Sequence, residues 1–144
     1  MKTISALQLL LWFVCGFHLL VGLSLNFPLV PLDLLARYYG ASVTWTPQFV
    51  YILKPLGAFM FVLGGLAAAA ALKPLHHKAI VYGFVALFAI RASQRLVFRQ
   101  ELESAFAIPD GKNLGSMVLF FALAAVLFVL YRAAEKRQPL RSEG

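Results

Sequence analysis

The chain has 144 residues, of which 61% are hydrophobic and 13% are charged, and its formal net charge is +7. Soluble domains normally carry about 25% charged residues, so this composition excludes an ordinary soluble domain and indicates an integral membrane protein. The Lys and Arg residues form no basic patch interleaved with aromatic residues, so we expect no nucleic-acid partner. A single cysteine, Cys15, excludes an intrachain disulfide and a thiolate metal site.

The first apolar run covers residues 4–25. It is longer than the hydrophobic region of a secretory signal peptide, so we predict a retained transmembrane helix. Cys15, His18 and Gly22 follow one another at i, i+3 and i+7 and form a smaller, more polar stripe along this helix. The stripe should face other helices rather than lipid.

A short helix is predicted over residues 31–39, with Pro31 near its first turn and Gly40 as its stop. Its tyrosines and mixed charges are typical of the membrane interface. A second transmembrane helix follows at about residues 48–72. In it, Gly64 and Ala68 form a small-xxx-small pair that lets a neighbouring helix approach closely.

The connection at residues 73–78 is short, which predicts that the second and third helices are antiparallel neighbours. The third transmembrane helix, at about residues 78–99, carries Arg91, Gln94 and Arg95 on one face. A charged side chain near the bilayer centre costs roughly 2.5–3.5 kcal/mol, so such residues face a bundle interior, a watery cavity or the headgroups.

A polar loop is expected over residues 100–113, with a turn signal at Pro109, Asp110 and Gly111, and it could extend the third helix by a turn or two. The fourth transmembrane helix, at about residues 114–132, has no charged residue before Arg132. The predicted fold is therefore all-α: a four-transmembrane-helix bundle with a short interfacial helix between helices one and two. Residues 1–144 are expected to form a single membrane domain.

Cations gather on one side of this predicted topology. The N-terminus, the connection between helices two and three, and the C-terminal tail hold Lys2, Lys73, Lys78, Arg132, Lys136, Arg137 and Arg141. The positive-inside rule therefore predicts that both termini are cytoplasmic.

The topology also predicts a polar cluster in the outer half of the bundle. At about 1.5 Å per residue, His18 and Arg91 each lie about 9 Å below the outer ends of their helices, and Lys54 lies about as deep. None of the helices offers an acid at that depth, so the cluster needs an anion or a loop acid such as Asp33, Glu101 or Glu103. The candidate ligand-binding residues are His18, Lys54, Arg91, Gln94 and Arg95.

Plainer interpretations remain open for each of these residues. Arg95 can extend to the lipid headgroups, Arg91 can belong to an interhelical polar network, and His18 can be an interhelical hydrogen-bonding group. The chain has no phosphate-binding glycine loop, metal-protease motif or pair of carboxylates within a span, so we assign no catalytic residue and no metal ligand. We expect no resident cofactor, and a bound lipid or quinone is left open.

Three segments resemble the small four-helix DoxX-like membrane proteins: GFHLLVGL at residues 16–23, LKPLGAFMFVLGGLAAA at residues 53–69 and RASQRLVF at residues 91–98. Members of that family are associated with quinone-linked sulfur oxidation or with redox-stress membrane complexes. The resemblance implies an accessory or ligand-binding role more than an enzyme. We accordingly expect a protein of a bacterial inner membrane.

The sequence thus favours a small integral membrane accessory or ligand-binding protein with a basic pocket. Its expected partners are membrane lipids and other integral membrane chains or further copies of itself, within a larger redox or quinone-linked complex. The competing hypothesis is a membrane enzyme or transporter that acts on an amphipathic anion such as a lipid or quinone.

The predicted orientation can be tested by cysteine labelling. In a Cys15→Ala background, a cysteine placed at Ser142 should react with a membrane-impermeant thiol reagent only after the cytoplasmic side is exposed, because positive loops stay inside. Labelling of that cysteine from the outside of intact cells would show that the orientation is reversed.

Overall fold

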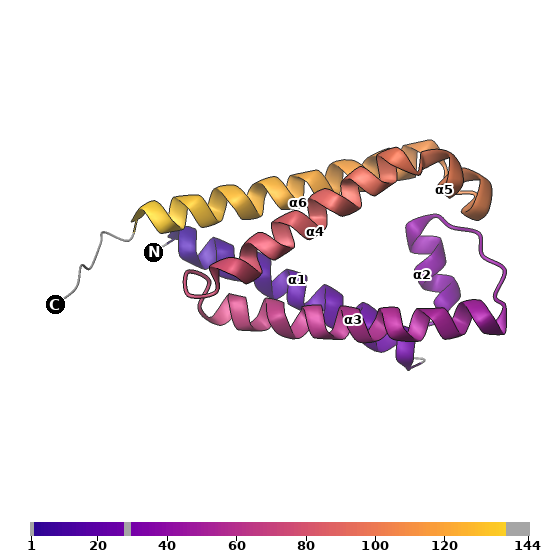
Figure 1. Cartoon of the computed structure of the whole chain (residues 1–144), viewed down its shortest axis with the longest axis horizontal. Helices are drawn as coiled ribbons and strands as arrows, with labels where there is room; N and C mark the ends of the chain where they lie inside the picture. The colour runs from indigo at the N-terminus through magenta and orange to yellow at the C-terminus, as the bar shows by residue number, and fades with distance from the viewer. Residues whose placement is uncertain (1, 28–29, 138–144) are drawn as a thin grey trace.

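A computed structural model describes residues 2–27 and 30–137 of the chain, and it folds them into six helices (Figure 1). These are α1 (Lys2–Asn26), α2 (Leu32–Tyr39), α3 (Pro47–Leu72), α4 (Lys78–Val97), α5 (Arg99–Phe106) and α6 (Asp110–Arg137). By length and composition, α1, α3, α4 and α6 are candidate membrane spans. The predicted all-α fold with four spans and a short helix between the first two is confirmed. Arg141, which was counted among the inside cations, lies outside the described residues.

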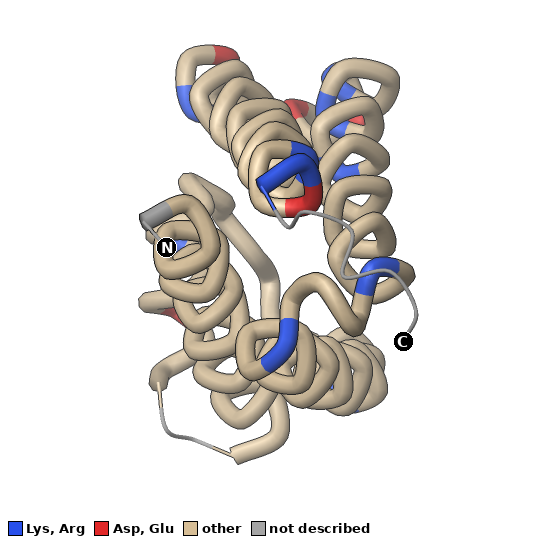
Figure 2. The backbone as a smooth tube through the Cα atoms, turned by 90° about the vertical axis from the view of Figure 1, so that its left-hand side faces the viewer, with Lys and Arg blue, Asp and Glu red and all other residues tan. Residues whose placement is uncertain are grey.

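The four long helices form two pairs. α1 packs mainly against α3, and α4 packs mainly against α6. Figure 2 views the bundle along its length and shows these pairs on opposite sides. The pairs converge where α1 begins and α6 ends, which we call the closed end, and separate toward α2 and α5, which we call the open end (Figure 1).

The predicted contact between the second and third spans is therefore only partly realised. α3 and α4 are antiparallel and meet at the closed end, but they diverge along the rest of their length (Figure 1). A short connection keeps the end of one helix close to the start of the next. The residues on the helix faces decide which helices pack against each other along their length.

Glycines explain why α3 packs against α1. A Cβ atom added at Gly22 would lie 2.7 Å from the backbone nitrogen of Phe61, and one added at Gly57 would lie 2.9 Å from the carbonyl oxygen of Gly22. A Cβ at Gly64 would lie 2.6 Å from Leu19 of α1. The two backbones approach this closely only because side chains are absent there. The stripe of Cys15, His18 and Gly22 is buried, as the sequence predicted.

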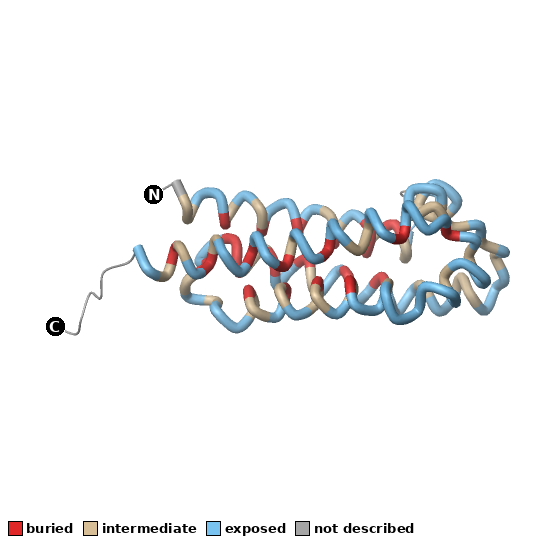
Figure 3. The backbone as a smooth tube through the Cα atoms, turned by 90° about the horizontal axis from the view of Figure 1, so that it is seen from above, coloured by how far each residue is buried: buried red, intermediate tan, exposed pale blue. Residues whose placement is uncertain are grey.

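Small residues also let the pairs converge at the closed end. Ala67, Ala70 and Ala71 of α3 are fully buried there and belong to one core with Leu7, Leu11, Val81 and Leu127. Figure 3 shows the buried positions on the helix faces that look inward. The other half of α3 carries bulkier side chains, including Leu53, Phe59 and Met60, and it lies where the pairs separate.

The open end is covered by α2, the loop after it and α5. α2 ends at Gly40, whose φ of 75° is the left-handed conformation that favours glycine. The backbone N–H of Ser42 then donates to the carbonyl oxygen of Phe106 at 2.7 Å, which ties this loop to the end of α5. Trp45 Nε1 donates to Asp33 at 2.5 Å and ties the end of this loop back to the first turn of α2.

The region after the third span differs from the prediction. Residues 99–106 form a separate helix, α5, because Phe98 leaves helical geometry at φ −99° and ψ 27°. α6 begins earlier than expected: Asp110 and Gly111 lie in its first turn, and Asn113 N–H donates to Pro109 O at 3.0 Å. An acid in the first turn is favoured by the helix dipole, so the residues of a turn signal here start a helix.

Arg99 and Asp110 form an exposed ion pair across this junction, in which Arg99 Nε donates to Asp110 Oδ1 at 2.7 Å. The hydrogen bond from the guanidinium to this carboxylate raises the pKa of Arg99 above its ordinary value. Both side chains remain largely exposed, so the pair contributes little to the stability of the fold.

The close contact between α1 and α3 predicts unequal effects of two alanine substitutions on the same helix. Gly57→Ala should lower the free energy of unfolding by about 1–3 kcal/mol, because its methyl group overlaps α1. Gly65→Ala is the matched control, since a Cβ there meets nothing within 4 Å. Reversible unfolding in mixed detergent micelles measures both. Equal stability of the two variants would contradict the contact.

Candidate functional site: two cavities between the helix pairs

A cavity of about 640 Å³ lies between α3 and α4 and reaches the cover at the open end. We call it the Arg91 cavity. Arg91, Gln94 and Arg95 line it from α4, on the single helix face that the sequence predicted. Most of its remaining lining is apolar, contributed by Val21, Leu25, Leu32, Leu35, Leu53, Leu56, Phe59, Met60, Leu63 and Leu102 among others.

Arg91 is half-buried at the wall of this cavity. Its guanidinium carbon lies 4.9 Å from the ring centroid of Phe120, a cation–π distance. Among the described residues, no side chain or carbonyl forms a hydrogen bond or an ion pair with Arg91. The charge of Arg91 therefore has an aromatic neighbour but no anionic one within residues 2–27 and 30–137.

The loop acids do not fold toward this arginine. Asp33 is exposed and accepts the hydrogen bond from Trp45, while Glu101 and Glu103 are exposed on α5. Within the described part of the chain, the carboxylates that form ion pairs are Asp110 and Glu135. The sequence left two partners open for Arg91, a bound anion or a loop acid. The described residues provide no support for a loop acid.

Arg95 lies one turn further along α4 and is satisfied within the protein. Its Nη1 donates to Asn113 Oδ1 at 3.1 Å, and Asn113 Nδ2 donates back to the carbonyl oxygen of Arg95 at 3.0 Å. Asn113 is only 5% exposed, so this reciprocal pair joins α4 to α6 in a buried position. Arg95 thus has a structural partner that Arg91 lacks.

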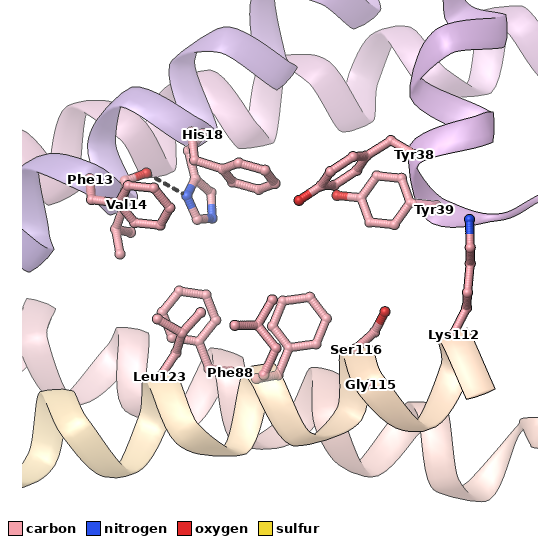
Figure 4. Close-up of a pocket in the computed structure, with 13 residues that line it drawn as sticks. Phe13, Val14, His18, Tyr38, Tyr39, Phe88, Lys112, Gly115, Ser116 and Leu123 are labelled. Carbon is pink, nitrogen blue, oxygen red and sulfur yellow. Dashed lines mark hydrogen bonds between the residues drawn. The ribbon is translucent and has the colours of Figure 1, made fainter. Parts of the chain in front are cut away.

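A second cavity, of about 360 Å³, lies between α1 and α6 and is shown in Figure 4. We call it the His18 cavity. His18 is 1% exposed, and its Nδ1 lies 2.8 Å from the carbonyl oxygen of Val14 in the same helix. Its Nε2 has no hydrogen-bond partner among the described residues. Tyr38 and Tyr39 of α2 and Ser116 of α6 extend into the same space (Figure 4).

The predicted cluster is thus divided by the structure. Arg91, Gln94 and Arg95 share one cavity, and His18 lines the other. Lys54 is exposed on α3 and lines neither of the two. Residues at the same depth along the membrane normal can still lie on helix faces that point away from each other. Which faces meet depends on how the helices pair. Whether these residues bind a ligand stays a prediction.

The sequence interpretation did not include two residues that shape the site. Tyr39 lines both cavities, although the tyrosines of α2 were interpreted as interface anchors. Phe120 lies against both Arg91 and Arg95 and also lines the His18 cavity. A phenylalanine in a purely apolar helix carries no sequence signal for such a position, whereas the amphipathic pattern of α2 indicates an inward face.

The chain matches no family model, no curated protein and no solved structure in the comparisons with known proteins. The resemblance to DoxX-like proteins consequently stays a prediction, and what can be stated is a small all-α protein with four candidate membrane spans. Any functional assignment depends on the geometry of the two cavities.

The hydrogen-bonded pair of Arg95 and Asn113 predicts a measurable contribution to stability. Asn113→Leu should lower the free energy of unfolding by roughly 0.6–1.7 kcal/mol, the range for interhelical hydrogen bonds in membranes. Ser93→Ala is the control, because the Ser93 hydroxyl donates only to Ala89 O of its own helix. Unfolding in mixed micelles that gave the same stability for both variants would show that the pair contributes nothing.

Proposed function

We propose that this integral membrane protein is a ligand-binding or accessory protein that holds an amphipathic molecule in the Arg91 cavity. The apolar part of the molecule would occupy the Leu- and Phe-lined space, and an anionic or oxygen-bearing head group would accept hydrogen bonds from Arg91. A membrane lipid or a quinone has both parts. Such a protein would act within a larger membrane complex of other integral membrane chains or of its own copies.

The observation that carries this proposal is the unbalanced charge of Arg91. A guanidinium within an apolar cavity is strongly disfavoured unless an anion or hydrogen-bond acceptor lies against it. No acid is present among the residues that line the cavity, and Arg95 already has Asn113. A phosphate, carboxylate or carbonyl oxygen of a bound molecule would supply the missing acceptor.

The cavity walls also suggest how such a molecule would enter. Phe59 and Leu56 line the cavity from α3, yet they are 69% and 48% exposed. In a membrane-spanning bundle the exposed side of α3 would face lipid, and α3 and α4 diverge toward the open end, where α2 lies between them (Figure 1). A hydrocarbon chain could then enter from the bilayer without crossing water. If both termini are cytoplasmic, the open end and this cavity lie toward the outer leaflet.

Catalysis or transport of the same class of molecule is the competing proposal. The polar groups that α4 presents to the cavity are cationic and amide donors, which bind and orient an anion but do not by themselves abstract a proton or attack a bond. Binding is therefore the function that these residues support best. Turnover of the retained molecule by the purified protein would favour the competing proposal.

Substitution of Arg91 tests the proposed binding. Arg91→Leu should reduce retention of phosphatidylglycerol and of a short-chain ubiquinone by about 10- to 100-fold, the effect of losing a hydrogen bond to a charged group. Lys54→Leu is the matched control, since it removes an exposed cation from a neighbouring span. Extraction of protein purified in mild detergent, followed by mass spectrometry, measures retention.

Equal retention by Arg91→Leu, Lys54→Leu and the unmodified protein would contradict the proposal. It would show that Arg91 extends to the headgroups and that its side chain is dispensable for binding. Circular dichroism and unfolding of each variant would establish that the fold is intact in this comparison.

A further inference from the structure

The hydrogen bond of His18 fixes which of its ring nitrogens carries a proton. The carbonyl oxygen of Val14 can only accept, so Nδ1, at 2.8 Å, must be the donor. In a neutral imidazole the other nitrogen, Nε2, then carries a lone pair and is an acceptor. The residues that line the His18 cavity include Lys112 but no carboxylate, so no group there would balance an imidazolium.

The position of the imidazole ring is fixed by aromatic neighbours. Phe17 and Phe84 contact it edge-on, each with ring centroids 5.7 Å from that of His18. His18 is 1% exposed, and Nε2 has no partner among the described residues. Figure 4 shows this nitrogen directed into the space between α1 and α6. A buried acceptor without a partner raises the free energy of the folded protein, so a ligand that donates a hydrogen bond to it is favoured over one that does not.

The rest of the cavity favours an aromatic occupant. Phe13 and Phe17 of α1, Phe88 of α4 and Phe120 of α6 line it, and rings packed among them gain offset or edge-on contacts. The volume of about 360 Å³ lies within the range of small-molecule sites. Phe13 is exposed as well as lining the cavity, so the space opens laterally between α1 and α6.

We propose that the His18 cavity is a second ligand site, which takes a phenol. The phenolic O–H would donate to His18 Nε2, and the ring would lie among the phenylalanines. The two cavities differ in the hydrogen-bonding group that they require of a ligand: Arg91 requires an acceptor, whereas His18 requires a donor. The proposal therefore goes beyond the proposed function and does not depend on it.

A pair of probes that differ in one hydrogen-bond donor tests this site. The protein, uniformly ¹⁵N-labelled and reconstituted in nanodiscs, is titrated with 4-pentylphenol and with its methyl ether, 4-pentylanisole. The phenol should bind about tenfold tighter than the ether, because only the phenol satisfies Nε2. The ¹⁵N resonance of His18 Nε2 should shift with the phenol and not with the ether.

Three variants locate the effect. His18→Phe keeps an aromatic ring but has no acceptor, and it should bind the two probes equally. His76→Phe removes an exposed histidine at the closed end and should keep the preference for the phenol. Gly115→Leu should weaken phenol binding while His18 stays in place, because Gly115 lines the cavity and a Cβ there meets nothing within 4 Å. This variant serves as the test if His18→Phe fails to fold.

Equal binding of the phenol and the ether by the unmodified protein would overturn the proposal, as would a preference that persists in His18→Phe or phenol binding that is undiminished in Gly115→Leu. Absence of the phenol preference in the unmodified protein, together with intact retention of phosphatidylglycerol, would overturn this inference alone. Retention is a separate readout, so its failure would count against the proposed function and leave the phenol site standing.

Discussion

The backbone contact between α1 and α3 decides how the other helices are arranged. Gly22 and Gly57 let these two helices approach until no Cβ atom fits between them, so the face of α3 that carries Gly57 packs against α1. The face of α3 toward α4 carries Leu53, Leu56 and Phe59, which require room. α4 therefore packs along α6 instead, and the interior of the protein becomes the space between two pairs. Both cavities are consequences of this pairing.

The sequence predicts the positions of the helices far better than it predicts which helices pack against each other. About 20 apolar residues are needed to cross the hydrocarbon, so run length alone locates the four spans, and Pro31 and Gly40 delimit α2. The sequence allowed the third helix to extend by a turn or two, but it gave no sign of the break that makes α5 a separate helix, because Phe98 interrupts the helix without any proline or glycine. The pairing was missed because α3 carries small residues on much of its surface, and nothing in the sequence says whether α1 or α4 uses them. The division of the predicted cluster between two cavities, with Lys54 outside both, follows from that one unknown.

Arg91 and Arg95 show why a polar residue in a span cannot be interpreted from its spacing alone. They lie on one face of α4 and both approach Phe120, at 4.9 and 6.0 Å. Arg95 meets Asn113 only because α6 begins at Asp110, about one turn earlier than its apolar run indicates, which brings the asparagine into the helix. The start of a neighbouring helix thus decides which of the two arginines has a hydrogen-bond partner among the described residues.

His18 illustrates the same point at the level of a single atom. The sequence left open whether it joins two helices or contacts a ligand, and the structure shows that its internal hydrogen bond stays within α1. The ring is held by its own helix through Nδ1 and by neighbouring phenylalanines, so Nε2 is not needed for helix packing. A nitrogen that the fold orients but does not use has the chemistry of a binding group. Tyr39 of α2 lines both cavities, so the position of its side chain would respond to occupation of either space.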